Sequence, residues 1–460
     1  MKKFIEAAIA SLFNRNAGRR GKKPFVRGLD LGARLIDGEP VQDRVQIPHN
    51  RRAESIGLLG KTGTGKSHLL RHLAKQDIEA LRGFIFFDLH GDQTPFLLGT
   101  IADHEKTLKQ NLDDRLIVVE PDDQQMSVGA NPLEPRIGTS RFVQIADLMY
   151  VLKQRCQMES LGVRTEELLR NSLHVLADND LTLLELGLLL ADAAFRAGCM
   201  KKVTNAEVRQ YFELRYDTVS EPMKAAMREP VLNKISAFTA DPHFRHIVGQ
   251  RHSTFSLIDA MDRGFWIILN LHKGKLGEQS ATLGSLLLTM GKHSLFSRGS
   301  RELFTFYCDE IQNLVAYGGS GLETVLSEAR KFSVSIVSAN QFLDQYPPEM
   351  RSAILAMGSH AFFQLSSSDA QQVAAALDGG KALAEILKNL PRRNMVVKTG
   401  AERWQQALVP TVAEPKSDPS DLYARSRSRW ARKRSDIEAD IAQRQTSAKR
   451  KTKETLDDWE

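Results

Sequence analysis

The sequence predicts an α/β protein built on a mainly parallel sheet that is interrupted by an all-α insertion. Between residues 51 and 122, short apolar runs alternate with helical runs in the order βαβαβ, which is typical of a parallel sheet covered by helices. Residues 138–235 lose the strand pattern and show helical periodicity instead. Strand-like runs return between residues 236 and 410, so we expect the sheet to resume after the insertion.

The first strands are expected at "SIGLLG", "FIFFDLHG" and "RLIVVEPDD", and the helical run "SHLLRHLAKQDIEALRG" lies between the first two. Within the insertion, "FVQIADLMYVLKQR" and "TEELLRNSLHVLADN" have the periodicity of consecutive helices. Five further strands are expected at "FWIILNL", "LFTFYCDE", "SVSIVSAN", "HAFFQLS" and "NMVVKTG". The segments "GSLLLTMGKHSLFSR" and "DAQQVAAAL" between them can form helices that cover the sheet.

The remaining parts of the chain are polar. Beyond about Val412 both charge signs are interleaved, as in "ARSRSRWARKRSDIEADIAQRQ", which indicates a flexible or singly helical tail. The predicted organisation is a basic N-terminal segment (1–27), an α/β domain (28–137 and 236–410), the all-α insertion (138–235) and a charged tail (411–460).

Composition sets broad limits on the class of protein. The 460 residues are 42% hydrophobic and 26% charged, which is ordinary for a globular chain of roughly two to three domains. A net charge of +7 is compatible with a polyanionic partner without requiring one. Three widely separated cysteines form neither a zinc motif nor a disulfide framework, so we expect a reducing, cytoplasmic compartment.

We expect no transmembrane helix, because the best candidate, "LTLLELGLLLADAAF", is interrupted by Glu185 and Asp192. The N-terminus begins with basic and apolar residues, but Glu6 and a following basic run argue against an export signal. Its apolar residues recur at helical spacing, which permits a weak amphipathic surface helix. A solvated tail is the alternative for this segment.

A phosphate-binding loop is predicted at "GKTGTGKS", which matches G-x-x-x-x-G-K-[ST] between an apolar strand and an amphipathic helix. Gly63 and Gly65 let the backbone curl so that its amides face phosphate. Lys66 would reach the β and γ phosphates, and Ser67 would offer a hydroxyl to Mg²⁺. An incidental glycine-rich turn is the alternative. The expected nucleotide-binding residues are Gly60, Lys61, Thr62, Gly63, Thr64, Gly65, Lys66, Ser67 and His68.

A pair of carboxylates ends the strand in "LFTFYCDEIQNL". We expect Asp309 to hold Mg²⁺, usually through water, and Glu310 to orient or deprotonate the attacking water. This pair favours an ATPase that performs work over a GTPase-type switch, although an Asp-Glu pair after a strand is also a common helix N-cap. ATP and Mg²⁺ are therefore the expected cofactors.

Ligands of open parallel sheets bind at the carboxyl ends of the strands, and several polar features follow predicted strands here. The phosphate loop, Asp88, the pair Asp309 and Glu310, and Gln341 should therefore share one edge of the sheet. This convergence makes Gln341 a candidate sensor of the γ-phosphate or of its attacking water. An exposed strand-end residue is the alternative.

The chain resembles the HerA/FtsK superfamily of ring-forming P-loop ATPases, and within it the type IV secretion coupling proteins of the TraD/TraG kind. The resemblance covers residues 28–400 and implies a RecA-like motor domain interrupted by an all-α domain. It also implies a hexameric ring that threads DNA through a central pore and hydrolyses ATP at subunit interfaces. It is carried by "LLGKTGTGKS", "FFDLHGD", "GANPLE", "ILNLHKGKLGEQSATLGSLLLTMGKHSLFSR", "FYCDEIQNL" and "LSEARKFSVSIVSANQ".

The resemblance assigns Arg330, in "EARKF", as an arginine finger that enters the site of the neighbouring subunit. A helix C-terminal cation is the alternative. Lys331 is interpreted as a solvated or interface charge, and Arg298 as a lower-ranked interface candidate. Metal ligation by His90 is not expected, because no partner histidine or cysteine lies at ligand spacing.

DNA would be held mainly through its phosphates, and Lys273 and Lys275 in "HKGKLGE" are candidate contacts. The hypothesis is an ATP-dependent DNA-translocating motor, hexameric, with a secretion-channel or relaxase partner. Membrane-embedded coupling proteins begin with transmembrane helices, so this chain would be recruited peripherally to the inner membrane or would be a soluble HerA-type translocase. A protein-secretion ATPase and a nucleotide-switched assembly protein without DNA movement are further alternatives.

Overall fold

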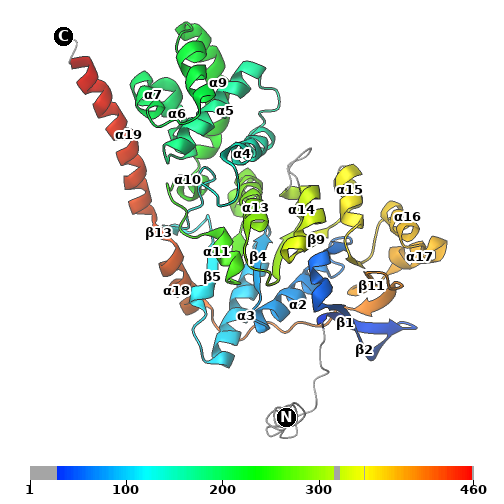
Figure 1. Cartoon of the computed structure of the whole chain (residues 1–460). Helices are drawn as coiled ribbons and strands as arrows, with labels where there is room; N and C mark the ends of the chain where they lie inside the picture. The colour runs from blue at the N-terminus through cyan, green and yellow to red at the C-terminus, as the bar shows by residue number, and fades with distance from the viewer. Residues whose placement is uncertain (1–27, 315–321, 347, 458–460) are drawn as a thin grey trace, which may run out of the picture.

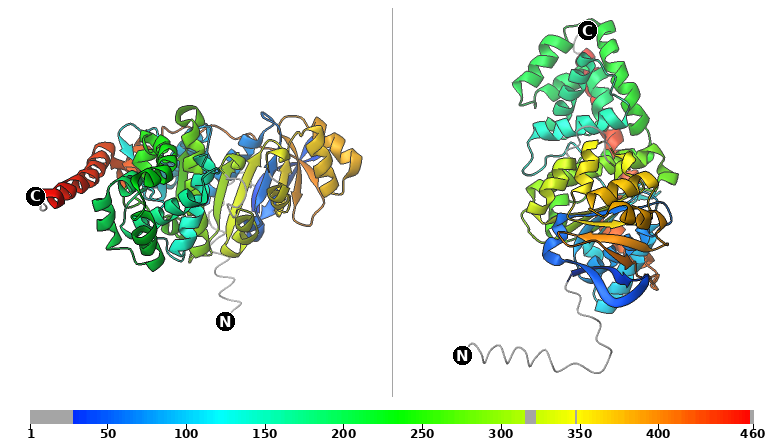
Figure 2. Two further views of the ribbon diagram at one scale, coloured as in Figure 1. Left: turned by 90° about the horizontal axis from the view of Figure 1, so that it is seen from above. Right: turned by 90° about the vertical axis from the view of Figure 1, so that its right-hand side faces the viewer.

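The computed structural model describes residues 28–314, 322–346 and 348–457 (Figure 1). The basic segment 1–27 lies outside the described residues. An α/β part contains a single large sheet, and an all-α part stands on one side of it, as the right-hand view of Figure 2 shows. Within the described parts of the chain, no helix combines the length and apolar character that a membrane crossing needs.

An 11-stranded sheet forms the centre of the α/β part, in the order β2-β1-β12-β11-β10-β3-β9-β8-β4-β7-β5. Its strands from β10 to β5 pair in parallel, and those from β10 to β2 pair antiparallel. The predicted mainly parallel α/β fold is confirmed. The strands are β1 (Gly28–Ile36), β2 (Glu39–Pro48), β3 (Ile56–Leu59), β4 (Gly83–Asp88), β5 (Leu116–Val119), β7 (Trp266–Asn270), β8 (Phe304–Asp309), β9 (Val334–Asn340), β10 (Ser359–Phe362), β11 (Asn394–Thr399) and β12 (Gln405–Leu408).

Central strands read as continuous apolar runs because helices cover both faces of the sheet. β4, β8 and β9 are buried at every position. Successive side chains of a strand point to opposite faces, so Phe84 and Phe86 join the core under α2 (Lys66–Glu79) and α3 (Gln93–Leu108), while Ile85 and Phe87 join the core under α13 (Glu278–Ser297). The other helices of this part are α11 (Leu257–Asp262), α12 (Lys273–Leu276), α14 (Leu322–Glu328), α15 (Pro348–Leu355), α16 (Ser367–Ala376) and α17 (Gly380–Asn389).

The all-α part lies between the short strand β6 (Met126–Ser127) and β7. Its helices continue to Val248, past residue 235 where the sequence interpretation ended the insertion. Leu168 and Leu173 of this part belong to the same buried cluster as Phe306 of the sheet, so the two parts share one core. The helices are α4 (Arg141–Arg155), α5 (Val163–Asp178), α6 (Leu186–Ala191), α7 (Ala193–Met200), α8 (Ala206–Gln210), α9 (Glu221–Thr239) and α10 (Pro242–Val248).

The charged tail is neither flexible nor a single helix; it forms α18 (Ser420–Trp430), β13 (Arg432–Lys433) and α19 (Arg434–Asp457). α18 packs on the sheet domain, where Ser426 Oγ donates to the carbonyl of Leu116 at 2.7 Å and Arg425 pairs with Glu105 at 2.7 Å. β13 pairs antiparallel with β6. The tail is ordered because its cations meet acidic side chains of the sheet domain.

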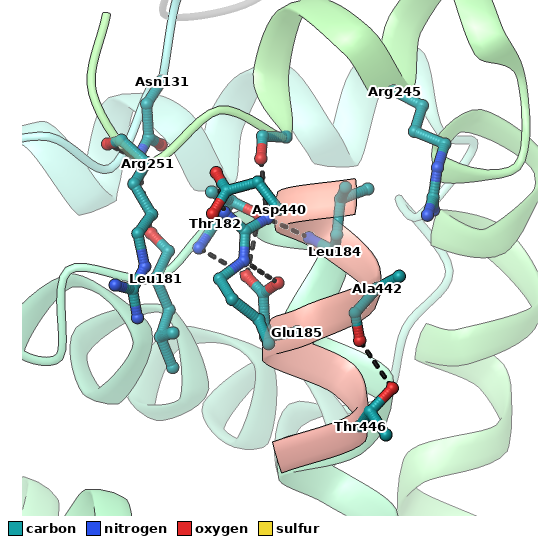
Figure 3. A network of polar contacts seen from close by, with 12 residues as sticks. Asn131, Leu181, Thr182, Leu184, Glu185, Arg245, Arg251, Asp440, Ala442 and Thr446 are labelled. Carbon is teal, nitrogen blue, oxygen red and sulfur yellow. Dashed lines mark hydrogen bonds and ion pairs between the residues drawn. The ribbon is translucent and has the colours of Figure 1, made fainter. Parts of the chain in front are cut away.

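α19 then continues along the all-α part (Figure 1). Ile437 and Ile441 are buried there against Leu184. Arg444 Nε donates to Glu185 Oε1 at 3.0 Å, and both side chains are buried. Figure 3 shows this network of contacts between α19 and the 3₁₀ turn that contains Glu185. The tail therefore contacts both parts of the molecule.

Candidate nucleotide site

The loop between β3 and α2 has the backbone that its glycines predict. Gly63 and Gly65 lie at φ +78° and +127°, in the region that side chains with a Cβ rarely adopt. A Cβ at Gly65 would also lie 3.1 Å from the Cα of Arg393. The loop opens α2 directly at Lys66, so the unpaired amides of the first helical turn lie beside it.

Lys66 is directed back into the loop. Its Nζ donates to the carbonyl oxygens of Gly60 and of Lys61, the latter at 3.0 Å, and Thr64 Oγ1 donates to the same Lys61 carbonyl at 2.7 Å. Burial lowers the pKa of Lys66, while Asp309 and Glu310 act to raise it. A cation held here by carbonyl oxygens and faced by carboxylates is suited to a phosphate chain.

The neighbouring strands bring the predicted carboxylates to this loop. β3 lies between β10 and β9, and β8 follows β9, with Leu59 opposite Asn340 and Asp309 opposite Ala339. The Gly60 amide donates to the Asn340 carbonyl at 3.1 Å, and the Glu310 amide donates to the Ala339 carbonyl at 2.9 Å. The phosphate loop, the carboxylates and Gln341 therefore share the carboxyl edge of the parallel strands.

Asp309 is the better candidate of the two carboxylates for holding a divalent cation. It is buried, and among the described residues its carboxylate accepts no hydrogen bond. Burial raises its pKa to about 6, although His90 acts to lower it. A bound cation would favour the ionised carboxylate that burial disfavours. Mg²⁺ commonly binds through one or two protein oxygens together with phosphates and water, so Asp309 and Ser67 fit this ion.

The Glu310 side chain accepts two hydrogen bonds and has one ion-pair contact. Gln341 Nε2 donates to Oε1 at 3.0 Å, Asn313 Nδ2 donates to Oε2 at 2.8 Å, and His90 Nε2 lies 3.4 Å from Oε1. The backbone of Glu310 is left-handed, at φ 55°, a conformation that costs energy for any residue with a side chain. The polar contact with His90 lowers the pKa of Glu310, so it is ionised at neutral pH.

His90 follows β4 and lies near the site, as expected from the sequence, and its partner there is Glu310. Its contact with Glu310 raises the pKa of His90 to about 9, so it is a cation at neutral pH. Asp88, in contrast, caps the start of α3, where its carboxylate accepts from Thr94 N and Oγ1, each at 2.7 Å, and from Gly91 N at 2.8 Å. Among the described residues no cluster of three or more His, Cys, Asp or Glu could hold a metal ion by itself.

Two backbone contacts from the far side of the loop were also missed. The Arg393 amide donates to the Thr64 carbonyl at 2.7 Å, and the Lys61 amide donates to the Gln364 carbonyl at 2.9 Å. His68 lies at the start of α2, where burial and then the cations of Arg71 and Arg393 lower its pKa. Because His68 is neutral, it adds no charge at the start of α2. Lys66 is the cation of the loop that faces Asp309 and Glu310.

Arg330 is not part of this constellation. It lies in the 3₁₀ turn η6 (Ala329–Phe332), which precedes β9, whereas Gln341 follows that strand. The side chain is 68% exposed and pairs with Glu54, which precedes β3, at 3.5 Å. At about 3.3 Å per residue, the seven residues of β9 separate Arg330 from Gln341 by about 20 Å.

The remaining charged candidates differ from one another. Lys273 is exposed on α12, and Lys275 is exposed but pairs with Asp122 at 2.7 Å. Both follow β7 at the carboxyl edge. Lys331 is exposed and pairs with Glu328. The interface assignment for Arg298 was wrong, because its side chain is buried and donates to the carbonyls of Met261 and Glu302.

The fold and the loop define a P-loop nucleotide-binding protein. Residues 34–219 match the family model described as the central domain of the helicase HerA. No curated protein matches the chain. The match spans less than half of the chain, and it agrees with the resemblance to the HerA/FtsK superfamily that the sequence indicated.

Solved structures with similar folds include conjugative coupling proteins. The bacterial conjugative coupling protein TrwBΔN70 aligns with a TM-score of 0.57 and 16% identity over 87% of this chain and 98% of its own. The plasmid coupling protein TrwB in complex with ADP and Mg²⁺ aligns with a TM-score of 0.57 and 16% identity, over 88% and 99%. VirB4 of Thermoanaerobacter pseudethanolicus aligns with a TM-score of 0.56 and 16% identity, over 86% of this chain and 98% of its own. At these identities the likeness shows the fold.

Proposed function

We propose that this protein is a hexameric ATPase that moves DNA, acting as a coupling-protein-like factor in conjugative or type IV secretion transfer. One observation carries the proposal. Each chain has its phosphate loop and carboxylates at one edge of its sheet and an exposed arginine, Arg330, at the other edge, about 20 Å away along β9. An Arg330 that serves as an arginine finger would therefore reach the site of a neighbouring subunit and not its own, and a ring satisfies every copy at once.

In this proposal the residues of the carboxyl edge have separate roles in nucleotide binding and hydrolysis. The loop amides and Lys66 bind the phosphates, and Ser67 and Asp309 hold Mg²⁺, which neutralises charge on the phosphates when bound. Glu310 orients the attacking water and accepts its proton, while Gln341, 3.0 Å from Glu310, reports the presence of the γ-phosphate. Arg330 of the adjacent subunit stabilises the charge that develops during transfer.

The similar solved structures support a P-loop ATPase that binds a nucleotide together with Mg²⁺. TrwB has been solved with ADP and Mg²⁺ and with a non-hydrolysable GTP analogue, and the present chain has a loop and carboxylates suited to the same ligands. DNA would contact the exposed Lys273 and, once freed from Asp122, Lys275. We further propose that a secretion-channel or relaxase partner recruits the protein from the cytoplasm to the inner membrane.

An ATPase assay tests the proposal directly. ATP hydrolysis is measured at low salt with no DNA, with single-stranded DNA and with double-stranded DNA. We expect DNA to stimulate the wild-type protein, and both Lys66→Ala and Arg330→Ala to abolish hydrolysis. Absence of stimulation by either form of DNA would overturn the DNA-motor assignment.

The fold is as similar to VirB4 as to TrwB, with TM-scores of 0.56 and 0.57, so the fold does not separate the other candidates. A soluble HerA-type translocase would show DNA stimulation without a membrane partner. A protein-secretion ATPase would hydrolyse ATP without a response to DNA. A nucleotide-switched assembly protein would bind ATP and remain monomeric or dimeric in particle images, where a motor shows rings with a central hole.

A further inference from the structure

The exposed Arg330 has one fixed neighbour. Among the residues that the structure describes, Glu54 is the one carboxylate within ion-pair distance of it, with 3.5 Å between Arg330 Nη2 and Glu54 Oε1. Glu54 is 15% exposed, in contrast to the 68% of Arg330, so the carboxylate lies beneath the guanidinium. Both line a recess of about 520 Å³, together with Arg51, Leu326, Ser327 and Met357.

Glu54 is held in place from several directions. Arg51 donates to Glu54 Oε2 from Nε at 3.1 Å and from Nη2 at 2.9 Å, which leaves Oε1 for Arg330. The Gly358 amide donates to the Glu54 carbonyl at 2.8 Å, and a Cβ on Gly358 would lie 2.4 Å from the Cβ of Glu54. Arg51 in turn lies so close to Gly400 that a Cβ there would be 1.7 Å from Arg51 Nη2.

The turn that carries Glu54 is anchored in the core. It is the 3₁₀ turn η1 (His49–Glu54), in which Arg52 is wholly buried and pairs with Asp77 of α2 through two hydrogen bonds of 2.6 and 2.7 Å. Asp77 also accepts from the hydroxyl of Tyr307 at 2.7 Å. Removing either partner of such a buried pair would leave an uncompensated charge, so the pair holds η1 firmly.

η1 is also tied to the strand that follows Arg330. The Ile336 amide of β9 donates to the hydroxyl of Ser55, the residue after η1, at 3.1 Å. Arg330 stands on η6, directly before β9. The backbone segments that bear Glu54 and Arg330 are therefore fixed relative to each other, and the side chain of Arg330 is the mobile part of the pair.

We propose that Glu54 is a positioning residue for Arg330, which holds the guanidinium in the orientation from which it enters the ATP site of the neighbouring subunit. This inference rests on the proposed function, because it requires Arg330 to act across a subunit interface. A long exposed arginine samples many rotamers, and one fixed carboxylate beneath it restricts that sampling. Glu54 itself does not touch the nucleotide.

Kinetics of three variants test the proposal. Glu54→Ala should lower the kcat of DNA-stimulated hydrolysis about five-fold with the KM for ATP unchanged, which is the size of effect an exposed ion pair can supply. Glu54→Gln keeps an acceptor oxygen under Arg330 and should recover part of the loss. The matched control is Glu328→Ala, which removes the exposed carboxylate paired with Lys331 and should leave kcat unchanged.

Mixed rings give a readout that a purely structural role would not produce. Rings of Glu54→Ala and Glu310→Gln subunits should regain activity, because an intact site can meet an intact Arg330. Rings of Glu54→Ala and Arg330→Ala subunits should not regain activity. Both substitutions impair the same Arg330 function, so no subunit in such a ring supplies an intact Arg330 with an intact Glu54. In a doubly substituted chain, Glu54→Ala should add no loss to that of Arg330→Ala.

The outcomes separate this inference from the proposed function. If Arg330→Ala is inactive while Glu54→Ala, with an unchanged melting temperature, retains the wild-type kcat, the positioning role is overturned and the motor assignment stands. If Arg330→Ala hydrolyses ATP at the wild-type rate, the trans arginine and the role of Glu54 both fall. If Glu54→Ala does not fold, a Glu54→Gln variant that folds and keeps the full wild-type kcat also overturns the role, because the proposal expects only partial activity without the charge.

Discussion

Arg330 and Gln341 lie at opposite ends of β9, with Arg330 just before the strand and Gln341 just after it. Gln341 donates to Glu310 beside the phosphate loop of its own chain, whereas Arg330 pairs with Glu54 at the other edge of the sheet. One buried strand thus separates Gln341, beside the phosphate loop, from Arg330, which lies at the opposite edge of the sheet.

The first prediction is complementation between two inactive variants. Arg330→Ala should reduce hydrolysis by roughly 10³- to 10⁵-fold, and Glu310→Gln should also be inactive. Mixed rings should recover part of the activity, because some interfaces then pair an intact Glu310 with an intact Arg330. The measurement is the ATPase rate of mixtures across subunit ratios, with ring formation checked by particle images.

Lys331→Ala is the matched control for this experiment. It removes the adjacent cation, which is equally exposed and pairs with Glu328. It should hydrolyse ATP as the wild type does. Verified mixed rings with no recovery at any ratio would show that Arg330 acts within its own chain or not at all.

The second prediction separates binding from hydrolysis at Glu310. Glu310→Gln should bind ATP with wild-type affinity, because Lys66, Ser67 and Asp309 remain. Its turnover should fall by about 10²- to 10⁴-fold, the usual contribution of a positioned base. Titration with a fluorescent ATP analogue and single-turnover hydrolysis measure the two quantities. Hydrolysis at the wild-type rate would contradict the assignment, and Glu302→Gln, on the surface before β8, is the control.

The third prediction concerns the docking of α19. Arg444→Ala removes the partner of a wholly buried Glu185, whose carboxylate otherwise accepts only from Thr182 N and Oγ1, each at 2.8 Å, among the described residues. The Gly249 carbonyl, which accepts from Arg444 at 2.7 Å, loses its donor as well. An uncompensated buried charge costs about 3–5 kcal/mol, so α19 should detach.

Limited proteolysis measures this detachment, with cleavage expected within α19 of Arg444→Ala and not of the wild type. Arg432→Ala is the control, because Arg432 is exposed and lies 3.8 Å from Asp440. Equal protection of α19 in Arg444→Ala and the wild type would show that the buried pair does not hold the helix.

The fourth prediction is a pH dependence of stability at the junction of β1 and α2. Asp30 is buried, which alone would raise its pKa, but hydrogen bonds from His72 at 3.1 Å and from Arg44 Nε at 3.0 Å lower the pKa overall. A depressed folded pKa contributes stability above the unfolded value of about 4, and that contribution is lost as the pH falls through the folded pKa.

Urea unfolding of the wild type and Asp30→Asn at several pH values tests this. The variant should be less stable at about pH 7, and the difference should shrink as the pH falls below about 4. Asp43→Asn is the control, because Asp43 is exposed and pairs with Arg34 at 3.5 Å. A difference that grows as the solution becomes more acidic would contradict the sign of the pKa shift.

The parallel strands and the loop could be predicted because their signals are local. A strand buried on both faces needs a continuous apolar run, and the phosphate loop needs glycines with a lysine at fixed spacing. The hairpin of β1 and β2 was missed, although Asp37 and Gly38, at φ 51° and 84°, form the Asp-Gly pair that favours such a turn. β2 is largely exposed and lacks the strong apolar signal of the central strands.

Other features depend on contacts between distant residues. Arg425 of the tail pairs with Glu105, which lies 320 residues earlier in the sequence. No local sequence pattern predicts such a pairing. The contact of His90 with Glu310 likewise depends on the pairing of β4 with β8. Strand-end reasoning placed residues at the carboxyl edge, but it could not show which side chains approach one another there.

The pairing of β13 with β6 has a mechanical consequence. The chain enters the all-α part just after β6 and leaves it before β7, so two backbone crossings join this part to the sheet. The tail spans the same junction, with Lys433 opposite Met126 on one side and Arg444 bonded to Glu185 on the other. The tail thus adds a third connection between the two parts, beside the core that they share, and these contacts restrain rotation of the all-α part relative to the sheet.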